Sequence, residues 1–458
     1  MHFPPHPWIR NLFLALAVSQ AASAGQGTCF DLIRTGPVET RMNLVILAEG
    51  YIAGQEDQFR ADAAALLDQF FAVEPFLEYR AYFNVRGLFV ASAQAGSDHP
   101  RSGIFRDTYF NSSFDSFGID QVLTIPPNDR DPDPAHGRDR VQALVAAHAP
   151  ENQLVIVLVN DPEYGGSGGP ILIGSLNMAA AELLLHEAGH SLGGLADEYA
   201  DPYPIDPVEM PNATAQTRRD RIPWAAWIAA DTPLPTPATP EYAGVIGLFE
   251  GAQYQAQGWF RPRLECKMRA LGVPFCEVCR EQLLRVFYRR ARPIESVLPE
   301  TNRLEVAGNE RIRFEVRVPA PRSHSIRIEW DLDGKPMSID PVWFLDPRTL
   351  ANGSHAVHVR ASDATDWVRT DPEGRLEATA AWTLNVERPD LRLEMSLVSG
   401  SDAARVEVAG FAPRGFALER SADFQEWTPI LTNGLTDGRF QAELPVNRPG
   451  AFYRAVSR

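Results

Sequence analysis

The sequence predicts a mixed α/β (α+β) domain built on a mostly parallel sheet, followed by all-β modules at the C-terminus. Short apolar segments alternate with amphipathic helical segments up to about residue 292, which is the pattern of a parallel sheet with helical connections. Beyond that point helical periodicity disappears, and segments of alternating polarity are separated by turn residues. The chain has 458 residues, more than one average core holds, so the two patterns indicate separate domains.

The elements of the first domain follow one another in a regular order. Four short apolar segments predict strands: 43–51, 82–92, 153–160 and 171–175. Segments with apolar residues at helical spacing predict helices at 55–73, 138–149 and 177–192, and a last helix that ends near Arg292. Residues of about 95–137 form an irregular insertion, and the glycine-rich segment 161–170 is expected to be a flexible rim of a cleft.

The C-terminal part of the chain divides again. Alternating segments in residues 297–388 suit an Ig-like β-sandwich. A linker at Arg388-Pro389-Asp390 leads to a small β module at 391–458. The expected organisation is therefore an N-terminal segment (1–24), the α/β domain (25–292), the Ig-like β-sandwich (297–388) and the small β module (391–458).

The first 24 residues have the composition of an export signal. Arg10 is their only charged residue, and an apolar stretch leads to the small residues Ala22-Ser23-Ala24. This order is typical of a cleaved signal peptide, with an apolar N-terminal helix as the alternative. No later stretch reaches about 18 apolar residues. We therefore expect an exported protein (periplasm, cell surface or extracellular) with no stable membrane insertion.

The charge of the chain limits its partners. The net charge is −16, and an acidic surface repels phosphate, so we expect no nucleic-acid partner. Hydrophobic residues make up 45% and charged residues 22% of the chain, which is ordinary for globular proteins and specifies no oligomeric state.

The helix expected at 177–192 carries His186-Glu187-x-x-His190. Two histidines four residues apart lie on one helical face, so their ring nitrogens can converge on a tetrahedral Zn²⁺ ion. Glu187 then points beside the metal, where a carboxylate can accept a proton from water. We predict His186 and His190 as zinc ligands and Glu187 as general base.

The pair Gly193-Gly194 indicates where the chain turns back toward the metal, because glycine adopts positive φ without strain. In the metzincin pattern H-E-x-x-H-x-x-G-x-x-H/D the third ligand position corresponds to Ala196, which cannot bind a metal. Asp197 follows it and is the predicted third ligand, with Glu198 as the alternative and a residue outside the motif still open. Either carboxylate could instead orient the histidines.

Four cysteines remain after the expected cleavage: Cys29, Cys266, Cys276 and Cys279. An even number of cysteines in an exported chain favours disulfide bonds. The Cys276-x-x-Cys279 pair could instead be a redox pair or half of a zinc site. A structural zinc would need two more thiolate or imidazole ligands, and no histidine lies between residues 191 and 323.

Several segments together resemble the IgA-peptidase family of secreted bacterial zinc metallopeptidases: "NLVILAEGY", "FNV", "LVNDPEYGGSGG", "HEAGHSLGGLADEY", "GLFEGAQYQAQGWFRP" and "CKMR…FCEVC". They are collinear over about residues 30–285. The resemblance implies a metzincin-like catalytic domain that uses Zn²⁺ to hydrolyse peptide bonds of a protein or peptide substrate. It also implies that Met268 is the Met-turn residue beneath the zinc histidines, although a methionine is equally a soft packing residue.

Two tyrosines are further candidates for the site. Tyr254 and Tyr199 could hydrogen-bond a tetrahedral intermediate or its leaving group, since a phenol can stabilise an oxyanion, or they could simply pack. The expected function is that of an exported zinc-dependent endopeptidase. The alternative is a non-catalytic surface or glycan/protein-binding protein with a structural or vestigial metal site. Glu187 favours the enzyme, because a structural zinc needs no base beside its ligands.

Overall fold

The computed structural model describes residues 27–307, 310–388, 390–412, 415–435, 438–445 and 451–457. The expected export signal, residues 1–24, lies outside the described residues. No helix in the described part of the chain combines the length and apolarity needed to cross a membrane. The chain divides into two compact units. The first comprises Met1–Pro293, Pro319–Ile326 and Asp363–Glu377, and the second comprises Ile294–Val318, Arg327–Ser362 and Ala378–Arg458.

A six-stranded sheet with the order β1-β3-β2-β4-β6-β5 forms the centre of the first unit. Its strands are β1 (Thr28–Ile33), β2 (Met42–Glu49), β3 (Phe83–Phe89), β4 (Leu154–Val159), β5 (Gly166–Ser167) and β6 (Leu172–Ser175). β2 pairs in parallel with β3 and β4, and β4 pairs in parallel with β6. The edge strands β1 and β5 are antiparallel to their neighbours. The sheet is therefore mixed, with a parallel centre.

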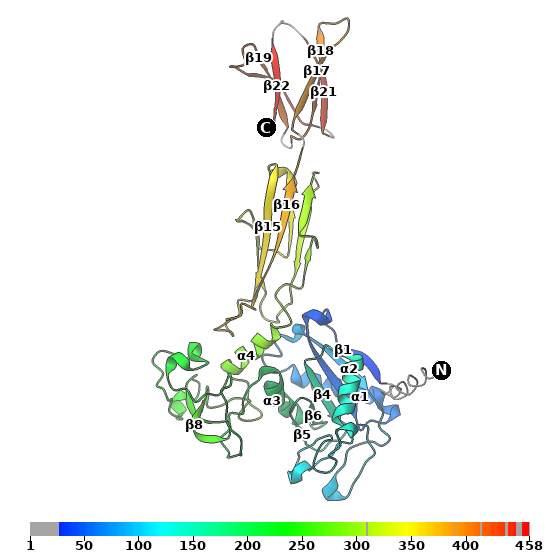
Figure 1. Cartoon of the computed structure of the whole chain (residues 1–458), viewed down its shortest axis with the longest axis vertical. Helices are drawn as coiled ribbons and strands as arrows, with labels where there is room; N and C mark the ends of the chain where they lie inside the picture. The colour runs from blue at the N-terminus through cyan, green and yellow to red at the C-terminus, as the bar shows by residue number, and fades with distance from the viewer. Residues whose placement is uncertain are drawn as a thin grey trace, which may run out of the picture. The chain divides into compact units, whose positions relative to one another are not determined.

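Helices cover both faces of this sheet (Figure 1). The α-helices of the described residues are α1 (Glu56–Phe70), α2 (Arg138–His148), α3 (Ala180–Gly193) and α4 (Glu277–Phe287). Leu44 and Ile46 of β2 join a core with α1, α3 and α4, whereas Val45 and Leu47 join a core with α2. Because successive side chains of a strand point to opposite faces, this double coverage explains the continuous apolar run of β2. A separate antiparallel hairpin, β7 (Phe249–Ala252) and β8 (Gln255–Arg261), follows α3.

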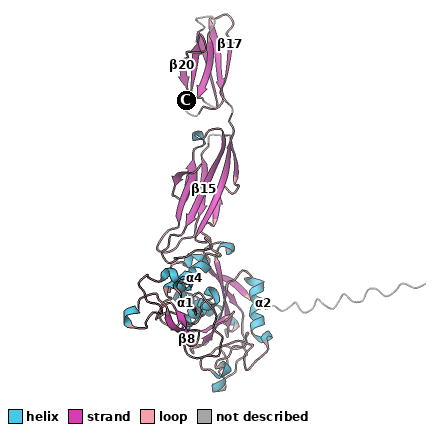
Figure 2. Ribbon diagram, turned by 60° about the vertical axis from the view of Figure 1, so that its left-hand side comes forward, coloured by secondary structure: helices cyan, strands magenta, loops and turns pink. Residues whose placement is uncertain are grey.

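Apart from a short 3-10 helix, η10 (Pro347–Thr349), the regular elements described in the second unit are strands, and the α-helices of the described residues all belong to the first (Figure 2). Its sheets have the orders β10-β16-β15-β12-β13, β14-β11-β9, β17-β18-β21 and β20-β19-β22. The strands are β9 (Ser296–Leu298), β10 (Arg303–Val306), β11 (Ile312–Arg317), β12 (Arg327–Leu332), β13 (Lys335–Ser338), β14 (Val342–Leu345), β15 (Gly353–Ser362), β16 (Glu377–Val386), β17 (Arg392–Leu397), β18 (Ala403–Ala409), β19 (Phe416–Ser421), β20 (Thr428–Asn433), β21 (Arg439–Pro445) and β22 (Phe452–Ser457). The α+β class with C-terminal β modules is thus confirmed, while the Ig-like assignment stays a prediction.

Two loops beyond residue 293 belong to the first unit. One carries Asp363, whose carboxylate accepts hydrogen bonds from the hydroxyls of Tyr79 at 2.8 Å and Tyr288 at 2.5 Å. The other carries His324, whose Nε2 lies 2.8 Å from the second oxygen of Asp363. Both tyrosines are fully buried. The expected domain boundary at residue 292 stays a prediction. A chain that ended there would lose the contacts of Asp363 and His324 with the first unit.

A chain of residues 25–292 is expected to fold and bind zinc, but to be less stable than a chain that continues to residue 388. The shorter chain lacks the Asp363 carboxylate to which Tyr79 and Tyr288 donate, and losing the partner of a buried polar group costs about 1–3 kcal/mol. Urea unfolding followed by tryptophan fluorescence measures the difference. Asp363→Ala in the full chain is the matched control. Equal unfolding midpoints for the two chain lengths would show that the loops add nothing to the first unit.

Candidate metal centre

α3 presents the His-Glu-x-x-His motif from a helix that is anchored in the core. Leu184, Leu185 and Ala188 are buried against the sheet and α4. Gly194 caps the C-terminus of the helix with a left-handed φ of 60°, and it donates its N–H to the carbonyl of His190 at 2.9 Å. Gly193, in contrast, is the last helical residue. Of the two glycines, therefore, Gly194 alone supplies the positive φ that the sequence suggested for the pair.

Three ligand atoms meet beside this helix. Nε2 of His186 lies 3.1 Å from Nε2 of His190 and 3.1 Å from Oδ1 of Asp197. The distance from His190 Nε2 to the same Asp197 oxygen is 3.2 Å. The structure thus brings the two predicted histidines together with the favoured carboxylate rather than with Glu198.

Backbone carbonyls fix which nitrogen each histidine presents. Nδ1 of His186 donates to the carbonyl of Lys267 at 2.8 Å, and Nδ1 of His190 donates to the carbonyl of Leu195 at 2.7 Å. A neutral imidazole that donates through Nδ1 keeps a lone pair on Nε2. Two such lone pairs and a carboxylate oxygen at these distances are a donor set that suits a tetrahedral zinc ion. The residues present therefore fit the metal that the motif implies.

The charges of the site favour an ionised carboxylate. Burial raises the pKa of Asp197, but its hydrogen bonds with His186 and His190 outweigh burial and hold that pKa well below the ordinary value. For His190, burial lowers the pKa, and the hydrogen bond and charge of Asp197 outweigh it, so that the net shift is upward. Asp197 is therefore available as an anionic ligand at any pH near neutral.

Glu187 lies against a glycine, close enough to His186, His190 and Asp197 for their charges to act on its pKa. A β-carbon built on Gly168 would come within 1.6 Å of Oε2 of Glu187, so the carboxylate occupies space that only glycine leaves open. The hydroxyl of Ser191 donates to the carbonyl of Gly169 at 2.9 Å and ties this loop to α3. The loop expected as a flexible rim is thus a wall of the Glu187 site. Burial raises the pKa of Glu187, although the charges of His186 and His190 oppose the shift.

The tyrosines contact the third ligand. The hydroxyl of Tyr254 donates to Oδ2 of Asp197 at 2.5 Å, and it lies 3.2 Å from the hydroxyl of Tyr199. Tyr254 stands in the turn between β7 and β8, where its N–H donates to the carbonyl of Tyr199 at 3.0 Å. Burial and the hydrogen bond to Asp197 raise the pKa of Tyr254 to about 12, so the phenol stays a donor. In this arrangement Tyr254 orients Asp197.

Met268 lies directly beneath the helical turn that joins the two histidines. It is fully buried, and a β-carbon on Gly189 would approach its Sδ to 2.5 Å, so the thioether packs against the glycine. The carbonyl of Met268 accepts the N–H of Glu198 at 2.8 Å. The side chain therefore packs against the histidine-bearing turn of α3, and its role as a Met-turn residue stays a prediction.

Glu198 takes no part in the histidine group. It is fully buried and belongs to a second group with Cys266, Cys276 and Cys279. All cysteines in the described part of the chain are free thiols, so the structure does not support the disulfide bonds that the sequence favoured. Cys29 is exposed and stands apart from the other three.

Sequence reasoning missed two groups that shape the site. Gly168 makes room for Glu187, and the carbonyl of Lys267 orients His186. A backbone carbonyl leaves no signal in residue type. Gly168 lies in the glycine-rich segment that was noted, but only the fold shows which side chain it faces.

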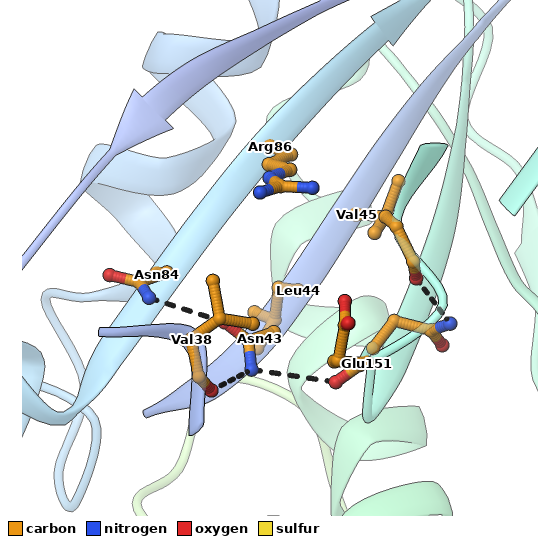
Figure 3. A pocket seen from close by; sticks show the side chains of 9 residues that line it. Val38, Asn43, Leu44, Val45, Asn84, Arg86 and Glu151 are labelled. Carbon is orange, nitrogen blue, oxygen red and sulfur yellow. Dashed lines mark hydrogen bonds between the residues drawn. The ribbon is translucent and has the colours of Figure 1, made fainter. Parts of the chain in front are cut away.

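A small cavity elsewhere in the unit is unrelated to this centre. Its volume is about 10 Å³, which is room for about one water molecule. Figure 3 shows the side-chain amide of Asn43 between Val38, whose carbonyl accepts its N–H at 2.8 Å, and Asn84, which donates to its oxygen at 3.2 Å. None of the residues that line the cavity belongs to the histidine group. We interpret the cavity as a packing defect beside the hydrogen-bonded amides of Asn43 and Asn84.

Comparison with known proteins gives one family match. The model of a family described as IgA Peptidase M64 matches residues 30–243 and 238–287, which together span more than half of the chain. No curated protein matches. Among solved structures, the apo structure of Bacteroides uniformis beta-glucuronidase 3 is 9% identical, with 44% of this chain and 29% of that chain covered and a TM-score of 0.15. A likeness of that extent carries no argument about the fold or function of this chain.

Proposed function

The chain belongs to the IgA peptidase M64 family, and from this premise we propose that it is an exported, zinc-dependent endopeptidase with a metzincin-like catalytic domain. The observation that carries the proposal is the meeting of ligand atoms of His186, His190 and Asp197 within 3.2 Å of one another, with Glu187 close enough for their charges to act on its pKa. The family makes it a peptidase, so its substrates are proteins or peptides. The proposal does not extend to immunoglobulin A in particular.

His186, His190 and Asp197 are the residues that would hold the zinc ion. When bound, zinc supplies Lewis-acid activation of water and of the scissile carbonyl. The three ligands carry one negative charge between them, since both imidazoles are neutral donors through Nδ1. The site as a whole then stays positive and keeps its Lewis acidity.

Glu187 is the proposed general base. Its carboxylate occupies space that Gly168 leaves open, within range of the charges of the three ligand residues. It would accept a proton from the attacking water and deliver it to the departing amine, and its raised pKa brings it closer to the working pH that such a shuttle needs. A non-catalytic metal site has no use for this carboxylate, which is why the binding-protein alternative is the weaker one.

Tyr254 and Met268 support the ligands. Tyr254 donates to the Asp197 oxygen that does not face the histidines, so we assign it first to positioning the third ligand. A direct hydrogen bond from its hydroxyl to the reacting carbonyl stays a proposal. Met268 packs against Gly189 on the core side of α3 and keeps the histidine-bearing turn in place.

Metal removal tests the proposal most directly. The purified full chain is expected to cleave denatured casein, and dialysis against 1,10-phenanthroline should lower the rate at least about 100-fold, because zinc contributes several kcal/mol to the transition state. Added Zn²⁺ should restore the rate, and a serine-protease inhibitor should leave it unchanged. Undiminished cleavage by a chain shown by elemental analysis to be metal-free would contradict the proposal.

Gly168→Ala is expected to impair catalysis without loss of metal. The new β-carbon would overlap the carboxylate of Glu187, which is the end of a flexible side chain, so the chain should fold while the base moves. We expect a decrease in kcat of about 10-fold or more, since misplacing a catalytic group by an ångström is costly. Gly244→Ala, where a β-carbon meets no atom within 4 Å, is the control. A wild-type kcat for Gly168→Ala would show that the contact with Glu187 is irrelevant.

A further inference from the structure

We propose that Glu198, Cys266, Cys276 and Cys279 form a second, structural zinc site directly behind the histidine site. One ligand atom from each residue lies within 4.8 Å of the others, and all four residues are buried. The inference concerns metal content and stability and does not rest on peptidase activity.

The distances between the donor atoms suit a tetrahedral ion. Sγ of Cys266 lies 3.6 Å from Sγ of Cys279, and Sγ of Cys279 lies 3.4 Å from Oε1 of Glu198. Ligands held about 2.3 Å (sulfur) and about 2.0 Å (oxygen) from a tetrahedral zinc are about 3.5–3.8 Å apart. A disulfide needs a sulfur–sulfur distance of about 2.05 Å and could join only two of the three cysteines.

A buried carboxylate oxygen points to a missing partner. Oε1 of Glu198 accepts a hydrogen bond from Asn212 at 2.9 Å, but Oε2 is buried without any hydrogen-bond partner. Such an atom is rare in a folded protein and requires an explanation, of which a bound ion is one. A cation among three thiolates and this carboxylate would compensate four buried anionic donors together.

The local backbone favours thiolates at this position. Cys276 is the N-cap of α4, and Cys279 lies in its first turn, so both sulfurs stand at the positive end of a helix. The N–H of Cys276 also donates to Sγ of Cys266 at 3.4 Å. Soft thiolate ligands select zinc, copper(I) or iron, and the single carboxylate together with the tetrahedral spacing favours zinc.

The second site connects the two segments that build the histidine site. Glu198 follows the proposed third ligand Asp197 in the chain, and the two side chains belong to different groups of ligand atoms. Cys266 precedes Lys267, whose carbonyl orients His186, and Met268, whose carbonyl accepts the N–H of Glu198. A metal bound to Glu198 and Cys266 would therefore fix both segments beneath α3.

The test measures metal in a chain without the histidine site. The double variant His190→Ala/Asp197→Ala of the full chain is expected to retain one equivalent of zinc. After exchange for cobalt(II) it should show thiolate-to-cobalt charge-transfer absorption, and zinc X-ray absorption should show sulfur neighbours at about 2.3 Å. Cys276→Ser in this background should lose the metal and the charge-transfer band, whereas the exposed Cys29→Ser should keep both.

Three results would overturn the inference. The first is a double variant that carries no metal. The second is an intact mass of the double variant that lies two hydrogens below the value of the reduced chain. The third is that all buried thiols of the double variant react with a thiol reagent after gentle unfolding in the absence of a chelator. If Cys276→Ser fails to fold, the spectra and the mass of the double variant still decide, because its cysteines are unchanged. Loss of peptidase activity plays no part in this test, so failure of the proposed function and failure of the second site are distinguishable.

Discussion

Glu187→Gln is expected to lower kcat/KM for peptide hydrolysis by about 10²–10⁴-fold, the range that a positioned general acid–base contributes. Glutamine has nearly the same shape as glutamate but cannot take up a proton. The space beside Gly168 should therefore accept it without strain. Steady-state kinetics on a quenched fluorescent peptide measure the loss.

The same variant should keep its metal. Glu187 is not one of the three residues whose ligand atoms converge, so elemental analysis should find the wild-type zinc content. Glu187→Asp is the second variant and should lower the rate less than Glu187→Gln, since it retains a base on a shorter side chain. A Glu187→Gln chain that cleaves at the wild-type rate would exclude Glu187 as the base. A chain that loses the histidine-site zinc would assign it a binding role instead.

The centre of the fold could be predicted because its signals are local. The apolar runs at 43–51 and 153–160 correspond to β2 (Met42–Glu49) and β4 (Leu154–Val159), which are buried on both faces. The edge strand β5 and the hairpin of β7 and β8 were not predicted. Their sequences are short, polar or glycine-containing, and edge strands bury too little surface to impose an apolar pattern.

In the candidate site, too, the residues with local sequence signals could be predicted and those that depend on distant segments could not. His186 and His190 could be predicted because helical geometry alone places residues four apart on one face. Asp197 followed from a local argument about a turn at glycine, and Gly194 makes that turn. Groups that depend on distant segments escaped, such as the Lys267 carbonyl behind His186.

The cysteine group shows a contact of Glu198 that local reasoning could not predict. The sequence pattern suggested only thiolates and imidazoles as zinc ligands beside Cys276 and Cys279, and it suggested Glu198 only as a partner of the histidines. The fold brings Glu198 to the cysteines because Asp197 and Glu198 face opposite ways.

Asp197→Ala is expected to weaken zinc binding at the histidine site by more than about 10–100-fold. That range is the effect of losing a residue that only hydrogen-bonds to a metal ligand, and here a ligand itself is lost. Oδ1 of Asp197 lies within 3.2 Å of both Nε2 atoms, while Oδ2 accepts the hydroxyl of Tyr254. Asp197→Asn should also weaken binding, since a neutral amide is a poorer zinc ligand. Competition with a zinc-sensitive chelating dye gives the affinities.

Glu198→Gln is the paired variant of Asp197→Asn, and each of the two variants should weaken metal binding at a different site. Its side chain is directed to the cysteines, so it should leave the zinc of the histidine site in place and weaken the thiolate-bound metal. With cobalt(II), Asp197→Asn should develop the charge-transfer band of the sulfur ligands as the wild type does, and Glu198→Gln should need a higher cobalt(II) concentration to develop it. Because the two residues are neighbours in the chain, a general disturbance of the backbone would affect both metals in both variants. The reverse pattern would transfer the third-ligand role to Glu198, and histidine-site affinities unchanged in both variants would place that ligand elsewhere in the chain.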